Sequence, residues 1–190
     1  MDLLKQRIRE QGQVLPGDIV KVDNFLNHRI DIPLLEAIAD EFIDLFQSSK
    51  PNLILTVEAS GIAVAYPVAK KLGVPLLFAK KGQAKNIGQD VFSADVHSYT
   101  RGNTYGVYVS RKYLNEDSRV LIIDDFLANG QVCLGLLSVC SQAKAQVSGI
   151  GIVIEKKWQR GSELVRNEGV RLESLAIIEK IVDGQVQFAE

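Results

Sequence analysis

Residues 120–132 read V-L-I-I-D-D-F-L-A-N-G-Q-V, and the rest of the chain is arranged around them. The first four residues, Val120 to Ile123, are all β-branched or Leu and show no polar alternation. This pattern is typical of a parallel strand that is buried on both faces.

Two adjacent carboxylates, Asp124 and Asp125, follow where that strand is expected to end.

A small-residue turn, Ala128-Asn129-Gly130, then leads into an apolar helical pattern over residues 132–139. Backbone N–H groups at a helix N-terminus can hold a phosphate, and the helix dipole favours its charge. Gly130 lets the backbone approach such a ligand closely. Carboxylates cannot bind phosphate directly, so the acidic pair is expected to serve hydroxyls or a cation, as in a phosphorylated sugar. The alternative is an Asx-type turn with Asn129 as the helix N-cap.

Length and composition indicate one ordinary globular domain. The chain has 190 residues, of which 46% are hydrophobic and 24% charged, so a full core is expected and disorder is not. The formal net charge of −1 argues against a general nucleic-acid binder, which should be basic. Cys133 and Cys140 lie seven residues apart on one expected helix face, which favours core packing over a disulfide. No signal segment or membrane-length apolar run is evident, so we expect a cytoplasmic protein without membrane contact.

Strand-like and helical patterns alternate along the chain, which predicts a mainly parallel sheet with right-handed crossovers. The expected strands are Leu53 to Val57, Leu76 to Ala79, Val147 to Ile154 and Val170 to Ile178, with a short alternating tail from Ile181 to Phe188. The expected helices are Met1 to Gln11, one starting at Asp31-Ile32-Pro33, Ile62 to Leu72 and Gly161 to Asn167. Asp31 is a plausible N-cap, and Pro33 is tolerated in a first helical turn.

The joint Glu58-Ala59-Ser60-Gly61 repeats the design of the central stretch: a strand end, small residues, a glycine and a helix start. Ligands of open α/β sheets collect at the carboxyl ends of the strands. A second anion site on the same edge of the sheet is therefore expected.

Residues 80–112 look least like core. Lys80, Lys81 and Lys85 open the segment, and alternating stretches at 91–100 and 105–110 flank a turn signal at 101–104. This predicts a flexible antiparallel hairpin flap that could exclude water from a reaction. A solvated surface hairpin is the alternative.

Motifs of other nucleotide enzymes are missing. The chain has no G-x-x-x-x-G-K-[ST] phosphate loop and no G-x-G-x-x-G at a helix start. His28 and His97 lie far apart without clustered cysteines, so a structural zinc site is not expected. We expect no metal site of the protein's own.

Four strings carry a family resemblance: K-V-D-N-F-L-N-H, A-S-G-I-A, L-I-I-D-D-F-L-A-N-G-Q and G-I-G-I-V-I-E-K. They closely resemble type I phosphoribosyltransferases of the xanthine-using branch, and the resemblance covers nearly the whole chain. It implies one domain over residues 1–190, with a small hood from about 12–30 plus the C-terminal segment and a flap at about 80–112. It also implies transfer of the phosphoribosyl group from phosphoribosyl diphosphate to N9 of xanthine, giving xanthosine 5′-monophosphate and diphosphate.

The resemblance assigns the sugar-phosphate side of a site by position. Asp124 and Asp125 bind the ribose hydroxyls, directly or through a magnesium ion that arrives with the substrate. Residues of two loops hold the phosphates: Ala128, Asn129, Gly130, Gln131 and Val132 the 5′-phosphate, and Glu58, Ala59, Ser60 and Gly61 the diphosphate.

The base side is assigned in the same way. Val20 and Asn27 contact the purine, Lys156 meets its carbonyl oxygens, and Trp158 covers the ring. Each also has a simpler interpretation, such as core packing for Val20, a turn for Asn27 or a solvated side chain for Lys156. The resemblance further implies a homodimer.

One departure bears on the substrate. Many type I relatives that handle 6-oxopurines have an Asp at the position of Ala128, where it works on N7. Xanthine is more acidic than hypoxanthine or guanine and needs a general base less, so Ala128 fits the xanthine-using branch. The alternatives are guanine or hypoxanthine as the main substrate, or a non-catalytic sensor of purine or phosphoribosyl diphosphate. Such sensors usually carry a DNA-binding domain, for which the sequence offers no spare segment.

Overall fold

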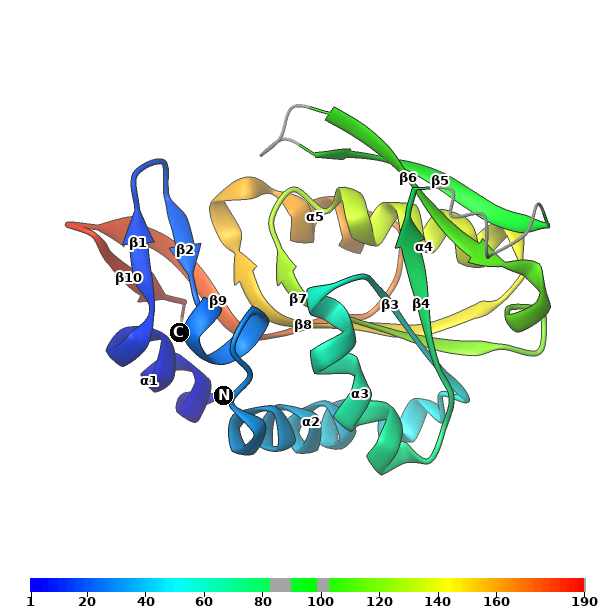
Figure 1. Ribbon diagram of the computed structural model, residues 1–190, viewed down its shortest axis with the longest axis horizontal. Helices are drawn as coiled ribbons and strands as arrows, with labels where there is room; N and C mark the ends of the chain where they lie inside the picture. Colours follow the sequence, from blue (N-terminus) through cyan, green and yellow to red (C-terminus); the bar gives the residue numbers. More distant parts are fainter. Residues whose placement is uncertain (83–89, 99–102, 190) are drawn as a thin grey trace.

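The computed structural model describes residues 1–82, 90–98 and 103–189. An eight-stranded sheet with the order β10-β9-β8-β7-β3-β4-β6-β5 runs through the molecule (Figure 1). The strands from β9 to β4 are parallel, and β10, β6 and β5 join at the edges in antiparallel pairs. The predicted, mainly parallel α/β sheet is thereby confirmed. The strands are β3 Leu53–Val57, β4 Leu76–Lys81, β5 Val91–Ser98, β6 Asn103–Ser110, β7 Arg119–Leu127, β8 Gln146–Lys156, β9 Leu172–Val182 and β10 Gln185–Phe188.

Helices cover both faces of the sheet, so the central strands face two cores. Helices α2 and α3 pack on one face, and α4 and α5 lie on the other, as Figure 1 shows. Strand β7 alternates between the cores: Leu121 and Ile123 enter one, and Val120 and Ile122 enter the other. This explains why its sequence shows no polar alternation. The helices are α1 Asp2–Gln11, α2 Ile32–Phe46, α3 Ser60–Leu72, α4 Gln131–Gln142 and α5 Gly161–Asn167.

The start of α2 follows the prediction. Asp31 is its N-cap and accepts a hydrogen bond from the Leu34 amide at 3.1 Å, with Pro33 in the first turn. That amide, together with the guanidinium of Arg7 with which Asp31 is paired, lowers the pKa of the Asp31 carboxyl. In α1, the sequence predicts an apolar stripe of Leu3, Leu4 and Ile8. Leu4 and Ile8 are buried as this predicts, but Leu3 is 45% exposed.

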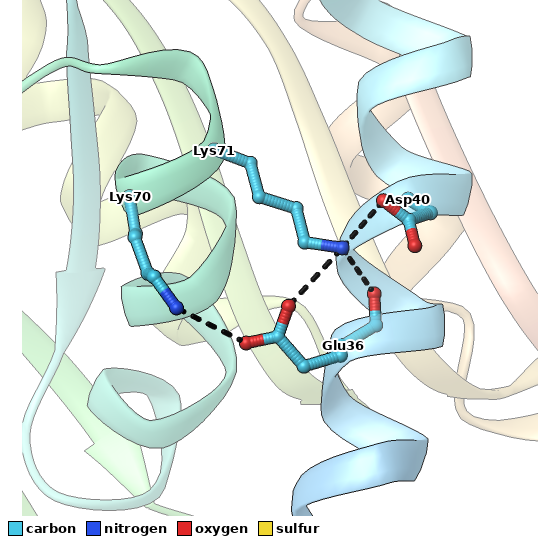
Figure 2. Close-up of polar contacts among 4 residues, drawn as sticks. All are labelled: Glu36, Asp40, Lys70 and Lys71. Atoms are coloured by element: carbon cyan, nitrogen blue, oxygen red, sulfur yellow. Dashed lines mark hydrogen bonds and ion pairs between the residues drawn. The ribbon is translucent and has the colours of Figure 1, made fainter.

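Helix α3 is held against α2 by an ion-pair cluster, shown in Figure 2. Lys71 Nζ lies 3.1 Å from Glu36 Oε2 and 2.5 Å from Asp40 Oδ1, and Lys70 Nζ lies 3.7 Å from Glu36 Oε1. The hydrogen bond to Asp40 is the main cause of a raised pKa at Lys71. Exposed pairs of this kind stabilise a fold only weakly. The cluster lies in the last turn of α3, at the opposite end from the second predicted anion loop.

The N-terminal segment before α2 packs beside the end of the chain. Its two short strands, β1 Gln13–Leu15 and β2 Ile19–Lys21, form a hairpin, and a π-helical turn, η1, covers Asp23–Asn27. The Arg9 guanidinium lies 4.9 Å from the centre of the Phe188 ring on β10. The mixture of apolar residues with Pro16, Gly17 and Asn24 over residues 12–30 predicts irregular or short-stranded structure, and the helical turn was not predicted.

Strand β7 runs further than the sequence suggested. Phe126 pairs with Ile154 and Leu127 with Glu155 on β8, so pairing continues beyond the carboxylates. The expectation that Asp124 and Asp125 follow the strand is wrong, because both lie within it.

The predicted hairpin of β5 and β6 is confirmed, with Val91 opposite Ser110 and Ser98 opposite Asn103. Its description as the least core-like part is wrong for one face. That face packs toward α4 through buried side chains, namely Phe92, Val96, Val107 and Val109. The expected flap residues Lys85, Gly88, Thr100, Arg101 and Gly102 lie outside the described residues.

Both cysteines pack in α4 as predicted. Cys133 and Cys140 are buried and unbonded to each other, and burial raises the pKa of both thiols, that of Cys140 to about 12. Within the described residues, none of the helices has the length and apolar character needed to cross a membrane.

Candidate active site

The acidic pair lies near the carboxyl end of β7 and is nearly covered. Asp124 is 4% exposed and Asp125 is 7% exposed. The Asp125 amide donates to Asp124 Oδ1 at 3.0 Å, and the Asn27 amide group donates to Asp125 Oδ2 at 3.0 Å. Burial, and then the neighbouring Asp125 charge, raise the pKa of Asp124 well above its ordinary value. Two adjacent carboxylates with few partners provide acceptors for hydroxyl groups or ligands for a cation.

The loop after β7 presents backbone N–H groups from the start of α4. Gly130 is the N-cap in a left-handed conformation with φ of 79°, and the Asn129 side chain accepts the Gln131 amide at 3.3 Å. The alternative with Asn129 as N-cap is therefore wrong, although its side chain does make a local turn contact. The first N–H groups of a helix have no intrahelical partner and form an anion site.

The start of α5 supports this loop from outside. The Gly161 amide donates to the Ala128 carbonyl at 3.0 Å. A Cβ added to Gly130 would stand 3.0 Å from the Gly161 carbonyl oxygen, and one added to Gly161 would stand 2.2 Å from the Ala128 oxygen. Two glycines thus allow two backbone segments to pack directly against each other, which fixes the loop's position.

The second loop, Glu58 to Gly61, reaches the same edge of the sheet at the N-terminus of α3. Its Glu58–Ala59 peptide bond is cis, and Glu58 Oε1 accepts the Lys81 amide at 2.6 Å. A Cβ added to Gly61 would lie 2.8 Å from Asp124 Oδ1. The structure therefore brings the second predicted loop into contact with the acidic pair.

A cavity of about 840 Å³ opens beside the first loop. The predicted residues Val20, Asn27, Ala128, Asn129, Gln131 and Lys156 line it. Its wall does not include the other predicted residues, which are Asp124, Asp125, Gly130, Val132, Trp158 and the loop Glu58, Ala59, Ser60 and Gly61. Asp125 is nevertheless joined to the cavity through its hydrogen bond with Asn27.

Lys156 is the half-buried cation of this cavity. Its Nζ donates to the Asp18 carbonyl at 3.2 Å, and burial lowers its pKa. Lys157 turns away to pair with Glu179 at 2.9 Å, so the two neighbouring lysines have different surroundings. Trp158 lies beside Lys156, with 5.8 Å from Nζ to the ring centre, and packs against the core.

Sequence reasoning missed several lining residues, namely Phe126, Gln159, Arg160 and Leu164. Phe126 directly follows the acidic pair, but its apolar side chain did not mark it as part of a site. Arg160 is held by two 3.0 Å contacts with Glu163, and it reaches the cavity through the connection between β8 and α5. No local pattern marks that connection as part of a site.

The two loops and the carboxylate pair lie at one edge of a parallel sheet. Helix N-termini bind phosphates and carboxylates accept hydroxyl groups, so this arrangement is typical of an α/β protein that binds a phosphorylated sugar. Comparison with known families gives the same class, since the model of the phosphoribosyl transferase domain matches residues 22–181. The chain belongs to the phosphoribosyltransferase family.

Curated relatives are similar over their whole length. A xanthine phosphoribosyltransferase of Lachnoclostridium phytofermentans is 50% identical, covering 99% of this chain and 98% of its own. One from Finegoldia magna is 48% identical and covers all of both chains. Among solved structures, adenine phosphoribosyltransferase of Trypanosoma brucei has a TM-score of 0.76 at 18% identity, covering 92% of this chain and 78% of its own. The Giardia lamblia enzyme has a TM-score of 0.75 at 20% identity, covering 94% and 98%. At such identities the structural likeness shows the fold.

Proposed function

We propose that the protein transfers the 5-phosphoribosyl group of phosphoribosyl diphosphate to N9 of xanthine, giving xanthosine 5′-monophosphate and diphosphate. One observation carries the proposal: the cavity joins the loop residues Ala128, Asn129 and Gln131 with Asn27 and Lys156. A phosphate held by that loop and a purine facing that lysine would occupy neighbouring parts of one site. The xanthine phosphoribosyltransferases that match the whole chain support this substrate.

The sugar-phosphate side uses the two loops. In this proposal the amides of Ala128 to Val132 hold the 5′-phosphate at the start of α4, and those of Glu58 to Gly61 receive the diphosphate. Asp124 and Asp125 accept the ribose hydroxyls. The Lys81 amide fixes the Glu58 side chain at 2.6 Å, which keeps this carboxylate turned toward β4.

A magnesium ion is implied by the family and suits the donor set. Asp124 and Asp125 offer carboxylate oxygens, which magnesium prefers. Among the described residues no group of three or more His, Cys, Asp or Glu could hold a metal together. Asp124 and Asp125 would be the residues that hold the ion, which when bound would supply positive charge to neutralise the departing diphosphate.

In this proposal two residues on the base side determine which purine is used: the cation Lys156, and Ala128, which replaces an acid. Lys156 can face a purine carbonyl oxygen, and its charge favours xanthine in its ionised form. Ala128 lines the cavity without a carboxylate. Because xanthine loses its proton more readily than hypoxanthine or guanine, it needs no general base at this position.

The chemistry then rests on positioning and charge. Breaking the bond between C1′ and diphosphate builds positive charge on the sugar, which the acidic pair stabilises, and negative charge on the leaving group, which the loop amides stabilise. Homodimer formation and a cytoplasmic location remain predictions.

The test is an initial-rate assay of the purified protein with magnesium, phosphoribosyl diphosphate and one of four purines: xanthine, guanine, hypoxanthine or adenine. We expect diphosphate release with a preference for xanthine. A preference for guanine or hypoxanthine would change the assigned substrate but not the enzyme class. If the protein binds phosphoribosyl diphosphate but releases no diphosphate with any of the four purines, the non-catalytic sensor is favoured.

A further inference from the structure

Strand β3 carries one polar side chain, Thr56, among four apolar ones, and this side chain is completely buried. Its Oγ1 has no hydrogen-bond partner among the described residues. Buried hydroxyls nearly always have a partner, because an unpartnered one destabilises the fold. Valine has almost the same shape and would avoid that cost. Packing alone therefore does not account for a hydroxyl at this position.

The Thr56 hydroxyl faces the acidic pair. A Cβ built on Gly61 would stand 2.1 Å from Thr56 Oγ1 and 2.8 Å from Asp124 Oδ1. Both oxygens thus lie against the space that a side chain at residue 61 would occupy. Asp124 Oδ1 already accepts the Asp125 amide at 3.0 Å. A carboxylate oxygen has room for a second donor.

We infer that Thr56 is a positioning residue for phosphoribosyl transfer: when phosphoribosyl diphosphate binds, its hydroxyl donates a hydrogen bond to the Asp124 carboxylate. The inference rests on the role given to Asp124 in the proposed function. With the Asp125 amide as one donor and Thr56 as the other, the carboxylate is fixed in rotation and directed at the ribose. Thr56 does not touch the substrate and acts through Asp124 alone.

Gly61 is the second part of this arrangement. It belongs to the loop proposed to receive diphosphate, and a Cβ at this position would clash with both Thr56 Oγ1 and Asp124 Oδ1. Any side chain larger than hydrogen at residue 61 would therefore displace one or both of the oxygens on which the inference rests.

The decisive variant is Thr56→Val, because it keeps the shape and removes the hydroxyl. Stability and activity should move in opposite directions. Loss of an unpartnered hydroxyl should raise Tm by about 2–4 °C. Loss of a hydrogen bond to a charged group should lower kcat/KM for phosphoribosyl diphosphate about 10-fold. The KM for xanthine should stay within about twofold of wild type.

Ser148→Ala is the matched control. Ser148 Oγ is the other buried side-chain atom without a partner in the described part of the chain, and it lies near the start of β8, at the far end from Lys156. Its removal should leave both kinetic constants unchanged. A second pair, Thr56→Ser and Thr56→Ala, loses the methyl group in both members and differs in the hydroxyl alone. Thr56→Ser should keep wild-type kinetics, and Thr56→Ala should not.

Wild-type kcat/KM in Thr56→Val would overturn the inference. So would equal losses in Thr56→Ser and Thr56→Ala, a comparison that holds even where the Val variant does not fold. Calorimetric titration with phosphoribosyl diphosphate and magnesium separates this result from failure of the proposed function. If the wild type binds that ligand but turns over no purine, the proposed function fails, while weaker binding by Thr56→Val than by wild type would still support the positioning role.

Discussion

Replacing Lys156 by methionine tests the assignment of the base side most directly. The change keeps an apolar stem of similar length and removes the charge. A hydrogen bond from a charged group contributes about 1.5–3 kcal/mol, and each 1.4 kcal/mol is about tenfold in binding. Lys156 already donates to the Asp18 carbonyl at 3.2 Å, so part of its capacity is used before the base arrives. We therefore expect the lower end of the range, with KM for xanthine raised about 10- to 30-fold.

The assay measures initial rates with each substrate varied while the other is saturating. KM for phosphoribosyl diphosphate should change by less than about twofold, since in the proposed function Lys156 meets the base and the loop amides hold the phosphate. Lys157→Met is the matched control, because Lys157 is the next residue, is exposed and pairs with Glu179. It should behave as wild type. Equal increases in both KM values for Lys156→Met, or the same increase in Lys157→Met, would refute the reasoning.

Three further changes address the first loop. Gly130→Val forces a β-branched residue into a left-handed conformation with its Cβ 3.0 Å from the Gly161 oxygen, so phosphoribosyl diphosphate should bind more weakly to the folded variant. Calorimetry measures this affinity, and an unchanged value would mean that the loop is only a structural turn. Gly161→Ala places a methyl group 2.2 Å from the Ala128 oxygen and should raise KM for phosphoribosyl diphosphate. Gly169→Ala meets no neighbouring atom but strains a backbone with φ of 74°, so it should lower stability without changing this KM; equal effects on KM would show that Gly161 does not act through the loop. Ala128→Asp should shift the ratio of kcat/KM values from xanthine toward hypoxanthine, since a carboxylate would repel anionic xanthine by about 1–3 kcal/mol; an unchanged ratio would contradict the account of Ala128.

The strands and helices that could be predicted are those whose signal is local. Residues Val120 to Ile123 show no alternation of polar and apolar side chains, because each face of β7 packs into its own core. Burial on both faces could therefore be predicted from these four residues alone. The capping contact of Asp31 involves a residue only three positions away. The helix over Gly161–Asn167 likewise begins and ends where its own residues indicate.

The features that could not be predicted depend on distant partners. Asp124 and Asp125 look like the end of a strand, because charged residues are uncommon in buried strands. Pairing of Phe126 and Leu127 with β8 overrides that local preference and draws the acids into the sheet. The inward face of the β5–β6 hairpin is apolar because α4 lies beneath it. Arg160 reaches the cavity only because β8 delivers the following connection to the same edge of the sheet.

Asn27 connects the two halves of the proposed site. Its side chain lines the cavity assigned to the base, and its amide group donates to Asp125 Oδ2 at 3.0 Å, on the side assigned to the ribose. The reaction must bring a ring nitrogen of the base to C1′ of the sugar, and misplacement by a fraction of an ångström is costly in rate. A residue that touches both sides sets their relative position through one short side chain. Under the proposed function, the turn Asp23–Asn27 therefore does more than cover the base. It aligns the base with the sugar, which explains why a segment from the start of the chain bonds to a carboxylate 98 residues further along.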